Sequence, residues 1–221
     1  MDGTQLLHIA IPFIAYLLGS IPFGLLVGSI FGGKDVRTVG SGNIGAANVS
    51  RVAGTGPGIL TLILDAAKGS VAVLLAARAT GDSATWMIVA GLCALIGHCY
   101  PLWLKFKGGK GVATAAGIFL VICPIALYIA LTIFILVVAF WRFVSLGSLA
   151  AAAAIPLLIY FLWAPPHAPP LVVSFGSLTI CGLVMYKHDA NMQRLVEGTE
   201  RKFSFSNKPK EPKAPDEKDA A

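Results

Sequence analysis

Long runs of apolar residues, joined by short segments that hold most of the charge, constrain this chain more than any other feature. Of its 221 residues, 56% are hydrophobic and only 13% are charged. Soluble globular domains usually contain about 25% charged residues. A chain so poor in charge needs a non-aqueous solvent around much of its length. The sequence therefore predicts an all-α polytopic membrane protein.

The apolar runs predict seven transmembrane helices, because a helix needs about 20 apolar residues to cross the bilayer core. The fourth and fifth runs are separated only by a break at Pro124, so one long kinked span is the alternative there. The predicted spans cover approximately residues 6–31, 58–77, 86–99, 112–123, 124–141, 146–163 and 170–186.

The cationic residues predict the orientation of these spans. With seven spans, one face receives the loops 32–57 and 100–111, the turn at Arg142 and the C-terminal tail, and with them 15 of the 17 Lys and Arg residues. The opposite face receives only Arg78, and Lys68 lies within a span. Because loops rich in Lys and Arg stay in the cytoplasm, we expect an external N-terminus and a cytoplasmic C-terminus.

The end of the chain differs from the rest. Residues 207–221 are polar, charged and proline-rich, which predicts a disordered cytoplasmic tail after a single membrane-embedded domain at 1–206. The basic residues carry no recognition motif, so we expect no nucleic-acid partner. The four cysteines lie in or beside apolar runs and form no CxxC pair, which favours packing roles over a disulfide or a metal site.

The first cytoplasmic loop contains a glycine-rich segment, GSGNIGAAN from residue 40. Three glycines within six positions let the backbone turn sharply and expose successive N–H groups to an anion. A helix beginning near Ile44 would add its positive N-terminal dipole. An ordinary turn is the alternative, but the crowding of polar donors favours anion binding. The candidate ligands are Gly40, Ser41, Gly42, Asn43, Asn48 and Arg51.

The second cytoplasmic loop places lysines among glycines at the start of an apolar helix. Lys110 lies between Gly109 and Gly111, two residues before the start of the helix predicted from residue 112. The free N–H groups of that helix would act on the same anion as the lysine. A positive-inside anchor would explain the lysines of this loop but not its glycines. His98, before the loop, is more typical of a structural histidine than of a ligand.

Polar residues also follow the last span. His188 and Asn191 are three residues apart, so a helix would place them on one face, which Arg194 extends. A solvated basic flank is the alternative. Arg142 and Ser145, at the turn after the fifth span, add further donors or an anchor.

Two charges interrupt the second span. Asp65 and Lys68 lie three residues apart, so we expect them to form a structural pair rather than a catalytic one.

Three clusters of donors at one membrane face predict a single site for a phosphate-bearing substrate that arrives from the cytoplasm. A metal-dependent lipid phosphotransferase would need clustered carboxylates, and Asp35 and Asp65 are too isolated for this. A transporter of organic phosphates would place its site near mid-membrane between related halves, and the sequence has no internal repeat. We therefore expect a site that does not depend on a metal.

Together these residues resemble the bacterial acyl-phosphate-dependent glycerol-3-phosphate acyltransferase family. Ala47 stands where the family often has threonine. The resemblance covers residues 5–203 and runs through GSIPFG from residue 19, the GSGNIGAAN loop with Arg51, Asp65 and Lys68, the segment GH…P…FKGGKGVAT, Arg142 and Ser145, and His188, Asn191, Arg194 and Glu200.

The resemblance implies seven transmembrane helices in the bacterial plasma (inner) membrane, with the active site facing the cytoplasm. It implies transfer of a fatty acyl group from acyl phosphate to the 1-hydroxyl of glycerol 3-phosphate, which gives lysophosphatidic acid and inorganic phosphate in phospholipid synthesis. Neither a metal nor a cofactor is implied. By matching positions, it implies binding or catalytic roles for Ser41, Arg51, Lys110, His188 and Asn191.

The remaining polar and glycine residues of the clusters complete the predicted substrate-binding set. The motifs hold no covalent nucleophile–base pair, so catalysis is expected to come from positioning and charge stabilisation. The phosphate of the acyl donor would be able to act as the base, which leaves His188 as a binding residue. The substrate-binding set is Gly40, Gly42, Asn43, Asn48, Gly108, Gly109, Arg142 and Ser145.

Overall fold

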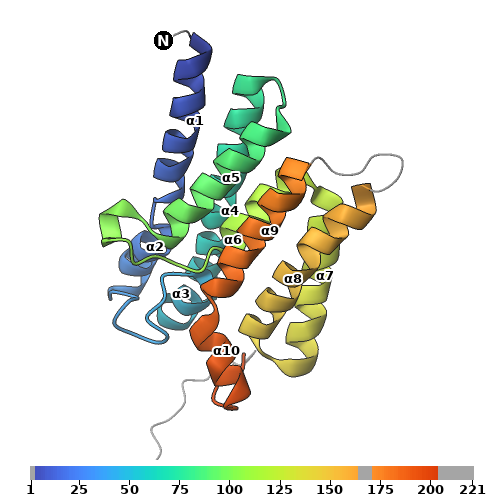
Figure 1. The fold of residues 1–221 in the computed structure, drawn as a ribbon. Coiled ribbons are helices and arrows are strands. Elements are labelled where there is room, and N and C mark those ends of the chain that lie inside the picture. The colour runs from blue at the N-terminus through green and yellow to red at the C-terminus, as the bar shows by residue number, and fades with distance from the viewer. Residues whose placement is uncertain (1–2, 164–170, 204–221) are drawn as a thin grey trace, which may run out of the picture.

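The computed structural model describes residues 3–163 and 171–203, and every regular element within them is a helix (Figure 1). This confirms the predicted all-α class for the described residues, whereas the predicted tail at 207–221 lies outside them. The helices are α1 (Gly3–Gly19), α2 (Phe23–Gly32), α3 (Ala46–Ala53), α4 (Thr55–Thr80), α5 (Ala84–Cys99), the 3-10 helix η1 (Leu102–Leu104), α6 (Val112–Ile122), α7 (Pro124–Trp141), α8 (Val144–Trp163), α9 (Leu171–Tyr186) and α10 (Asp189–Val196).

Several of these helices are suited to crossing a bilayer. Within the described residues, five stretches are long and apolar enough, and α9 with α10 would make a sixth although the two are bent by 58°. α6 has 11 residues and extends only about 16 Å, which is short of the hydrocarbon core. The predicted seventh span therefore stays a prediction. The five stretches are Leu6–Gly32, Thr55–Thr80, Ala84–Leu104, Pro124–Trp141 and Val144–Leu162.

The first predicted span is not one continuous helix. α1 ends at Gly19 and α2 begins at Phe23, because Pro22 has no N–H with which to continue the helix. The carbonyl oxygen of Ile21, exposed by this break, accepts a hydrogen bond of 2.9 Å from Lys68 Nζ on α4. A charged side chain from a second span therefore satisfies the backbone where the first span is interrupted.

The fourth and fifth predicted segments are separate helices rather than one kinked span. Cys123, with φ −150° and ψ 78°, leaves helical geometry, and Pro124 begins α7. α6 and α7 then run in opposite directions and pack against each other (Figure 1). The charge distribution favoured this arrangement, since a single span would have placed the following turn at Arg142 on the other face.

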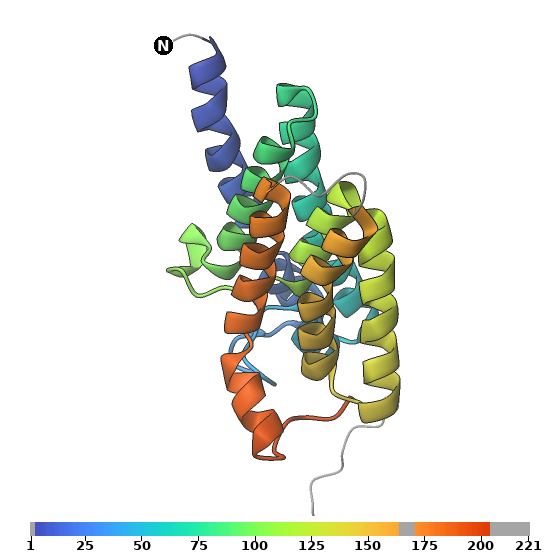
Figure 2. The same ribbon diagram turned by 45° about the vertical axis from the view of Figure 1, so that its right-hand side comes forward.

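Close helix packing fixes the position of α6. A methyl group added to Gly117 would fall 1.9 Å from the carbonyl oxygen of Ala66 on α4, so the two backbones are in contact. α6 begins two residues after Lys110, and this contact therefore limits how far that lysine can move along the bundle. α3, α10 and the loop before α3 lie at one end of the bundle, and the start of α1 lies at the other (Figures 1 and 2).

Candidate active site

A cavity of about 390 Å³ lies at the end of the bundle where α3, α10 and the second glycine-rich loop meet. Side chains from seven helices and from the loops before α3 and α6 contribute to its wall. Its volume is typical of small-molecule sites in proteins. The polar and charged lining consists of Ser41, Asn43, Asn48, Arg51, Asp65, His98, Lys110, Ser145, Ser148, His188, Asn191, Arg194, Glu200 and Arg201.

The structure brings most of the predicted site residues together around this cavity. Gly42, Gly108, Gly109 and Arg142 do not line it, and their predicted binding roles stay predictions. The predicted residues that do line it are Gly40, Ser41, Asn43, Asn48, Arg51, Lys110, Ser145, His188 and Asn191.

Asn48 holds the first glycine-rich loop in place. Its buried side chain accepts a hydrogen bond of 2.8 Å from the backbone N–H of Ser41. Its amide nitrogen donates to the carbonyl oxygens of Val36 and Val39, at 2.8 and 3.1 Å. Gly40 has φ +68°, and a side chain there would strike Asn48 Oδ1. Asn48 therefore fixes Ser41 at the cavity wall and has no amide hydrogen left for a ligand.

Arg51 brings a positive charge from α3 to the cavity. Within residues 3–163 and 171–203, no carboxylate lies within ion-pair distance of its guanidinium. Burial and the nearby Arg201 lower the pKa of Arg51, but a guanidinium stays protonated in proteins. Arg51 is therefore a charged donor available to an anionic ligand.

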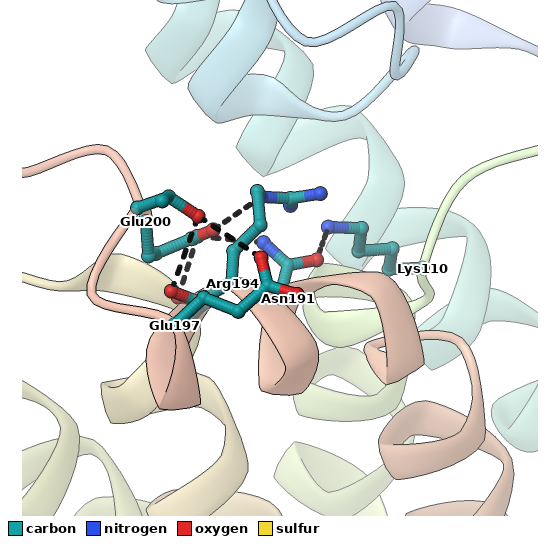
Figure 3. Close-up of polar contacts among 7 residues, drawn as sticks. Lys110, Asn191, Arg194, Glu197 and Glu200 are labelled. Atoms are coloured by element: carbon teal, nitrogen blue, oxygen red, sulfur yellow. Dashed lines mark hydrogen bonds and ion pairs between the residues drawn. The ribbon is translucent and has the colours of Figure 1, made fainter.

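Lys110 reaches from the start of α6 to α10 (Figure 3). Its Nζ donates a hydrogen bond to Oδ1 of Asn191. The amide nitrogen of Asn191 donates in turn to Oε1 of Glu200, at 2.7 Å. Ser145 donates to the same oxygen at 2.8 Å, and Arg194 binds Oε2 at 2.7 Å. Glu200 thus joins α8, α10 and, through Asn191, the second glycine-rich loop.

The electrostatics of the cavity favour an anion. Burial, together with the positive charges of Arg194 and Arg51, lowers the pKa of Lys110 to about 8, although the negative charge of Glu200 acts to raise it. Burial raises the pKa of Glu200, but its hydrogen bonds from Ser145, Asn191 and Arg194 outweigh burial and keep that pKa below its usual value. The lining contains four Lys and Arg side chains but only two carboxylates, and both carboxylates already form ion pairs with cationic side chains.

His188 lies at the junction of α9 and α10 and is buried. Its Nδ1 is 2.8 Å from the carbonyl oxygen of Val184. A neutral ring that donates from Nδ1 leaves Nε2 as a hydrogen-bond acceptor. His188 is therefore suited to accept a hydrogen bond from a hydroxyl group in the cavity.

The four predicted residues outside the lining have other contacts. The backbone N–H groups of Gly108 and Gly109 donate to the carbonyl oxygens of Cys99 and His98, each at 3.1 Å, which ties the second loop to the end of α5. Arg142 Nε donates to the carbonyl oxygen of Phe203 at 3.1 Å. Gly42 has φ +69° and allows the first loop to turn.

Sequence reasoning did not assign several lining residues to the site. Arg194, Glu200 and Arg201 belong to the polar cluster that follows the last span, but none of them was predicted as a ligand, although their place in that cluster was a signal. Ser148 was missed altogether. Asp65 and Lys68 do form the predicted pair, with 2.9 Å between Oδ1 and Nζ.

An apolar pocket of about 60 Å³ adjoins the polar cavity and shares Val112, Phe134 and Ser148 with it. It lies between α6, α7, α8 and α9, and its lining is almost entirely aliphatic or aromatic. In the part of the chain that the structure describes, no three His, Cys, Asp or Glu side chains converge as a metal site. Independence from metal stays a prediction.

A helical bundle with apolar helices long enough to span a bilayer and a cationic cavity at one end defines a polytopic membrane protein with a cavity suited to an anion. The sequence profile described as glycerol-3-phosphate acyltransferase matches residues 9–198. The chain belongs to this family, as the motifs indicated, and it is an acyltransferase of phospholipid synthesis.

Individual relatives agree with this assignment. The chain is 51% identical to a glycerol-3-phosphate acyltransferase of Syntrophotalea carbinolica over 191 residues, which covers 86% of this chain and 94% of the relative. It is 46% identical to one of Myxococcus xanthus over 196 residues, with 88% and 98% covered.

Solved structures match the fold as well. The crystal structure of PlsY (YgiH), described as an integral membrane glycerol 3-phosphate acyltransferase in its glycerol 3-phosphate form, has a TM-score of 0.82 at 36% identity, and the match covers 89% of this chain and 95% of that one. The lysophosphatidic acid form of the same protein has a TM-score of 0.80 at 34% identity.

Proposed function

We propose that this enzyme transfers a fatty acyl group from acyl phosphate to the 1-hydroxyl of glycerol 3-phosphate, giving lysophosphatidic acid and inorganic phosphate. The observation that carries the proposal is the continuity of the cationic cavity with an apolar pocket. The related PlsY is described with glycerol 3-phosphate and with lysophosphatidic acid. A phosphate group fits the first compartment, and the beginning of an acyl chain fits the second.

The proposed reaction is an acyl transfer without a covalent enzyme intermediate. The substrate hydroxyl oxygen attacks the acyl carbon, the bond from that carbon to the phosphate oxygen breaks, and the departing phosphate takes the hydroxyl proton. Lys110 and Arg51 stabilise the negative charge that develops on the leaving group, and His188 accepts a hydrogen bond from the reacting hydroxyl. Asn191 and Ser41 orient these groups.

The acyl chain of the donor lies along the apolar pocket between α6 and α9. Val112 and Phe134 line both compartments, so they mark the point where the acyl carbon meets the phosphate-binding residues. The lining beyond them includes Phe119, Leu127 and Ile155, which offer no hydrogen bonds to a polar group. This division supports a substrate with a charged head and an apolar chain.

The proposed topology has seven spans in the bacterial plasma membrane, with the N-terminus outside and the active site and C-terminus in the cytoplasm. The cavity cations lie at one end of the bundle, whereas Arg78 lies in the last turn of α4. Cysteine accessibility labelling at Thr4 and Ala214, in a variant without the four native cysteines, should place the two positions on opposite faces. Labelling of both from one side would contradict this topology.

Product detection tests the reaction itself. Purified enzyme is supplied with labelled glycerol 3-phosphate and, in separate reactions, with acyl phosphate or an acyl thioester of the same chain length. Only acyl phosphate should yield lysophosphatidic acid by mass spectrometry, with one equivalent of inorganic phosphate. Equal or faster turnover with the thioester would contradict the proposed donor while leaving the family assignment intact.

A further inference from the structure

Three ionisable side chains lie inside the bundle beside the cavity, and the proposed reaction uses none of them. Asp65, Lys68 and His98 are only 2%, 5% and 4% exposed. Ionisable groups at membrane depth are costly, so they usually pair with one another or serve a function. Asp65 Oδ1 lies 2.9 Å from Lys68 Nζ and 3.5 Å from His98 Nδ1, so all three are joined through one carboxylate.

Lys68 has a structural partner that explains its presence. Its Nζ also donates to the carbonyl oxygen of Ile21, at the break between α1 and α2. Lys68 does not line the cavity, whereas Asp65 and His98 both do. Closing the break in the first span accounts for Lys68 but leaves the placement of His98 unexplained.

His98 contacts the chain on both sides of Lys110. On one side, a methyl group added to Gly109 would fall 2.2 Å from Nε2 of His98, so the ring packs against the Gly109 Cα atom. On the other side, Nδ1 of His98 lies 3.2 Å from Oγ1 of Thr114, in the first turn of α6. The backbone N–H of Gly109 also donates to the carbonyl oxygen of His98. The imidazole ring therefore supports the segment that carries Lys110 at both of its ends.

We propose that His98, held by Asp65, is a positioning residue that fixes Lys110 in the cavity. Nδ1 lies 3.2 Å from the hydroxyl of Thr114 and 3.5 Å from the Asp65 carboxylate, and the Nε2 side of the ring packs against Gly109. In this role the ring acts on the substrate through the lysine. The inference rests on the proposed role of Lys110.

A double-mutant cycle between His98 and Lys110 tests this coupling. His98→Ala should lower kcat/KM by about 10- to 100-fold, because a displacement of about 1 Å at a charged contact has effects of this size. In a Lys110→Ala background the same substitution should cost less than about threefold, since there is no longer an ammonium group to position. The loss in His98→Ala should appear mainly in kcat if Lys110 acts on the leaving phosphate.

The outcomes of the cycle separate the two proposals. If the losses from His98 and Lys110 multiply, His98 acts independently of the lysine and the inference is wrong, while the role of Lys110 stands. If Lys110→Ala is fully active, the role of Lys110 fails and the inference fails with it.

Val73→Ala is the control for a general loss of stability. It removes part of a fully buried core side chain away from the loop, so it should lower the unfolding temperature but keep kcat/KM within about twofold.

A pair of size-compensating substitutions gives a second test. The three atoms nearest to a methyl group at Gly109 all belong to the His98 ring, so Gly109→Ala should displace that ring and lower kcat/KM by about tenfold or more. His98→Asn keeps a polar atom near the Nδ1 position but has no atom at Nε2. Adding Gly109→Ala to His98→Asn should therefore change kcat/KM by less than about twofold. Equal damage in both backgrounds would show that the ring contact does not position the loop.

Discussion

The two glycine-rich loops resemble each other in composition but use their glycines differently. In the first loop, Gly40 and Gly42 have φ values of +68° and +69°, and residues 37–42 are exposed. In the second loop, Gly108 and Gly109 lie against the end of α5, where a methyl group on either would fall 2.2 Å from another atom. Gly40 and Gly42 are needed for a left-handed backbone, and Gly40 also for its close approach to Asn48, whereas Gly108 and Gly109 are needed for close approach alone.

This difference explains how each loop holds its donors. The first loop is tied to α3 by the side chain of Asn48 and presents Ser41 at an open edge of the cavity. The second loop is tied to α5 by two backbone hydrogen bonds and is half-buried or buried from Gly108 onward. Lys110 is therefore held more rigidly than Ser41, as expected for a group that stabilises charge in a transition state.

The largest predicted effect concerns the second loop. Lys110→Ala should lower kcat/KM by about 30- to 1000-fold, because removing a charged contact from a partly dry site costs about 2–4 kcal/mol of transition-state stabilisation. Arg51→Ala should show a loss of the same order. Steady-state kinetics on folded variants, with both substrates varied, is the measurement.

Lys105 provides the matched control for that prediction. It lies on the exposed side of the same loop and lines no part of the cavity, so Lys105→Ala should keep kcat/KM within about threefold, because an interfacial lysine contributes only about 1 kcal/mol to membrane attraction. Equal damage from both substitutions would mean that the loop acts by its total charge. The contrast between a closely held second loop and an open first loop would then not explain the role of Lys110.

The close approach of Gly108 predicts the next largest effect. A methyl group there would meet the carbonyl oxygens of His98 and Cys99 at 2.2 and 2.8 Å and Cδ of Pro101 at 2.5 Å, and none of these atoms can move freely. Gly108→Ala should therefore displace the loop and lower kcat/KM by about 100-fold. A variant that kept full activity and an unchanged unfolding temperature would show that the second loop is not packed as closely as described.

The tie of the first loop gives a smaller effect. Asn48→Ala removes three hydrogen bonds at a buried position, which should lower the free energy of unfolding by about 2 kcal/mol and kcat/KM by about 10- to 50-fold. Thr38→Ala is the control, because Thr38 lies in the same loop, does not line the cavity, and its hydroxyl bonds only Asp35 within its own turn among the described contacts. Similar losses in both variants would indicate that any change in the loop is damaging, rather than the loss of its tie.

The sequence predicted the elements of this protein better than the contacts between them. Apolar runs and loop charges identified the helices and gathered Ser41, Arg51, Lys110 and His188 into one site, because these signals are local in the chain. The helix expected near Ile44 begins at Ala46. Pro22 marked the break in the first span, but a continuous apolar pattern on both sides concealed it.

The contacts that sequence reasoning missed are those that depend on packing. Substrate binding by Gly108 and Gly109 stays a prediction, but sequence reasoning did not predict that the backbones of these two residues bond to the end of α5. Glu200 joins residues that lie as far apart along the chain as positions 110 and 194: it bonds Asn191 and Arg194 directly and Lys110 through Asn191. No periodicity or spacing in a single sequence predicts that these particular side chains contact one another.

The pH dependence of the reaction should distinguish the cations of the two loops. The pKa of Lys110 is lowered to about 8, so the protonated lysine predominates below pH 8 and kcat/KM should fall about tenfold for each pH unit above it. Arg51 stays charged throughout this range. Lys110→Arg should have lower activity, since a planar fork replaces a compact ammonium, but no alkaline decline between pH 8 and 10. A decline that persists in that variant would assign the titration to another group.

The smallest predicted effect concerns Gly42, which turns the first loop but does not line the cavity. A side chain there would have only the carbonyl oxygen of Arg37 nearby, at 3.1 Å, so the main penalty is the left-handed backbone, about 1 kcal/mol for alanine. Gly42→Ala should therefore lower the free energy of unfolding by about that amount and change kcat/KM by less than about threefold. Gly42→Asn should be milder still, because asparagine tolerates this conformation. A stable Gly42→Ala variant with a rise in the KM for glycerol 3-phosphate above tenfold would show that the Gly42 backbone binds substrate. The first loop would then need its backbone to be placed as accurately as that of the second loop.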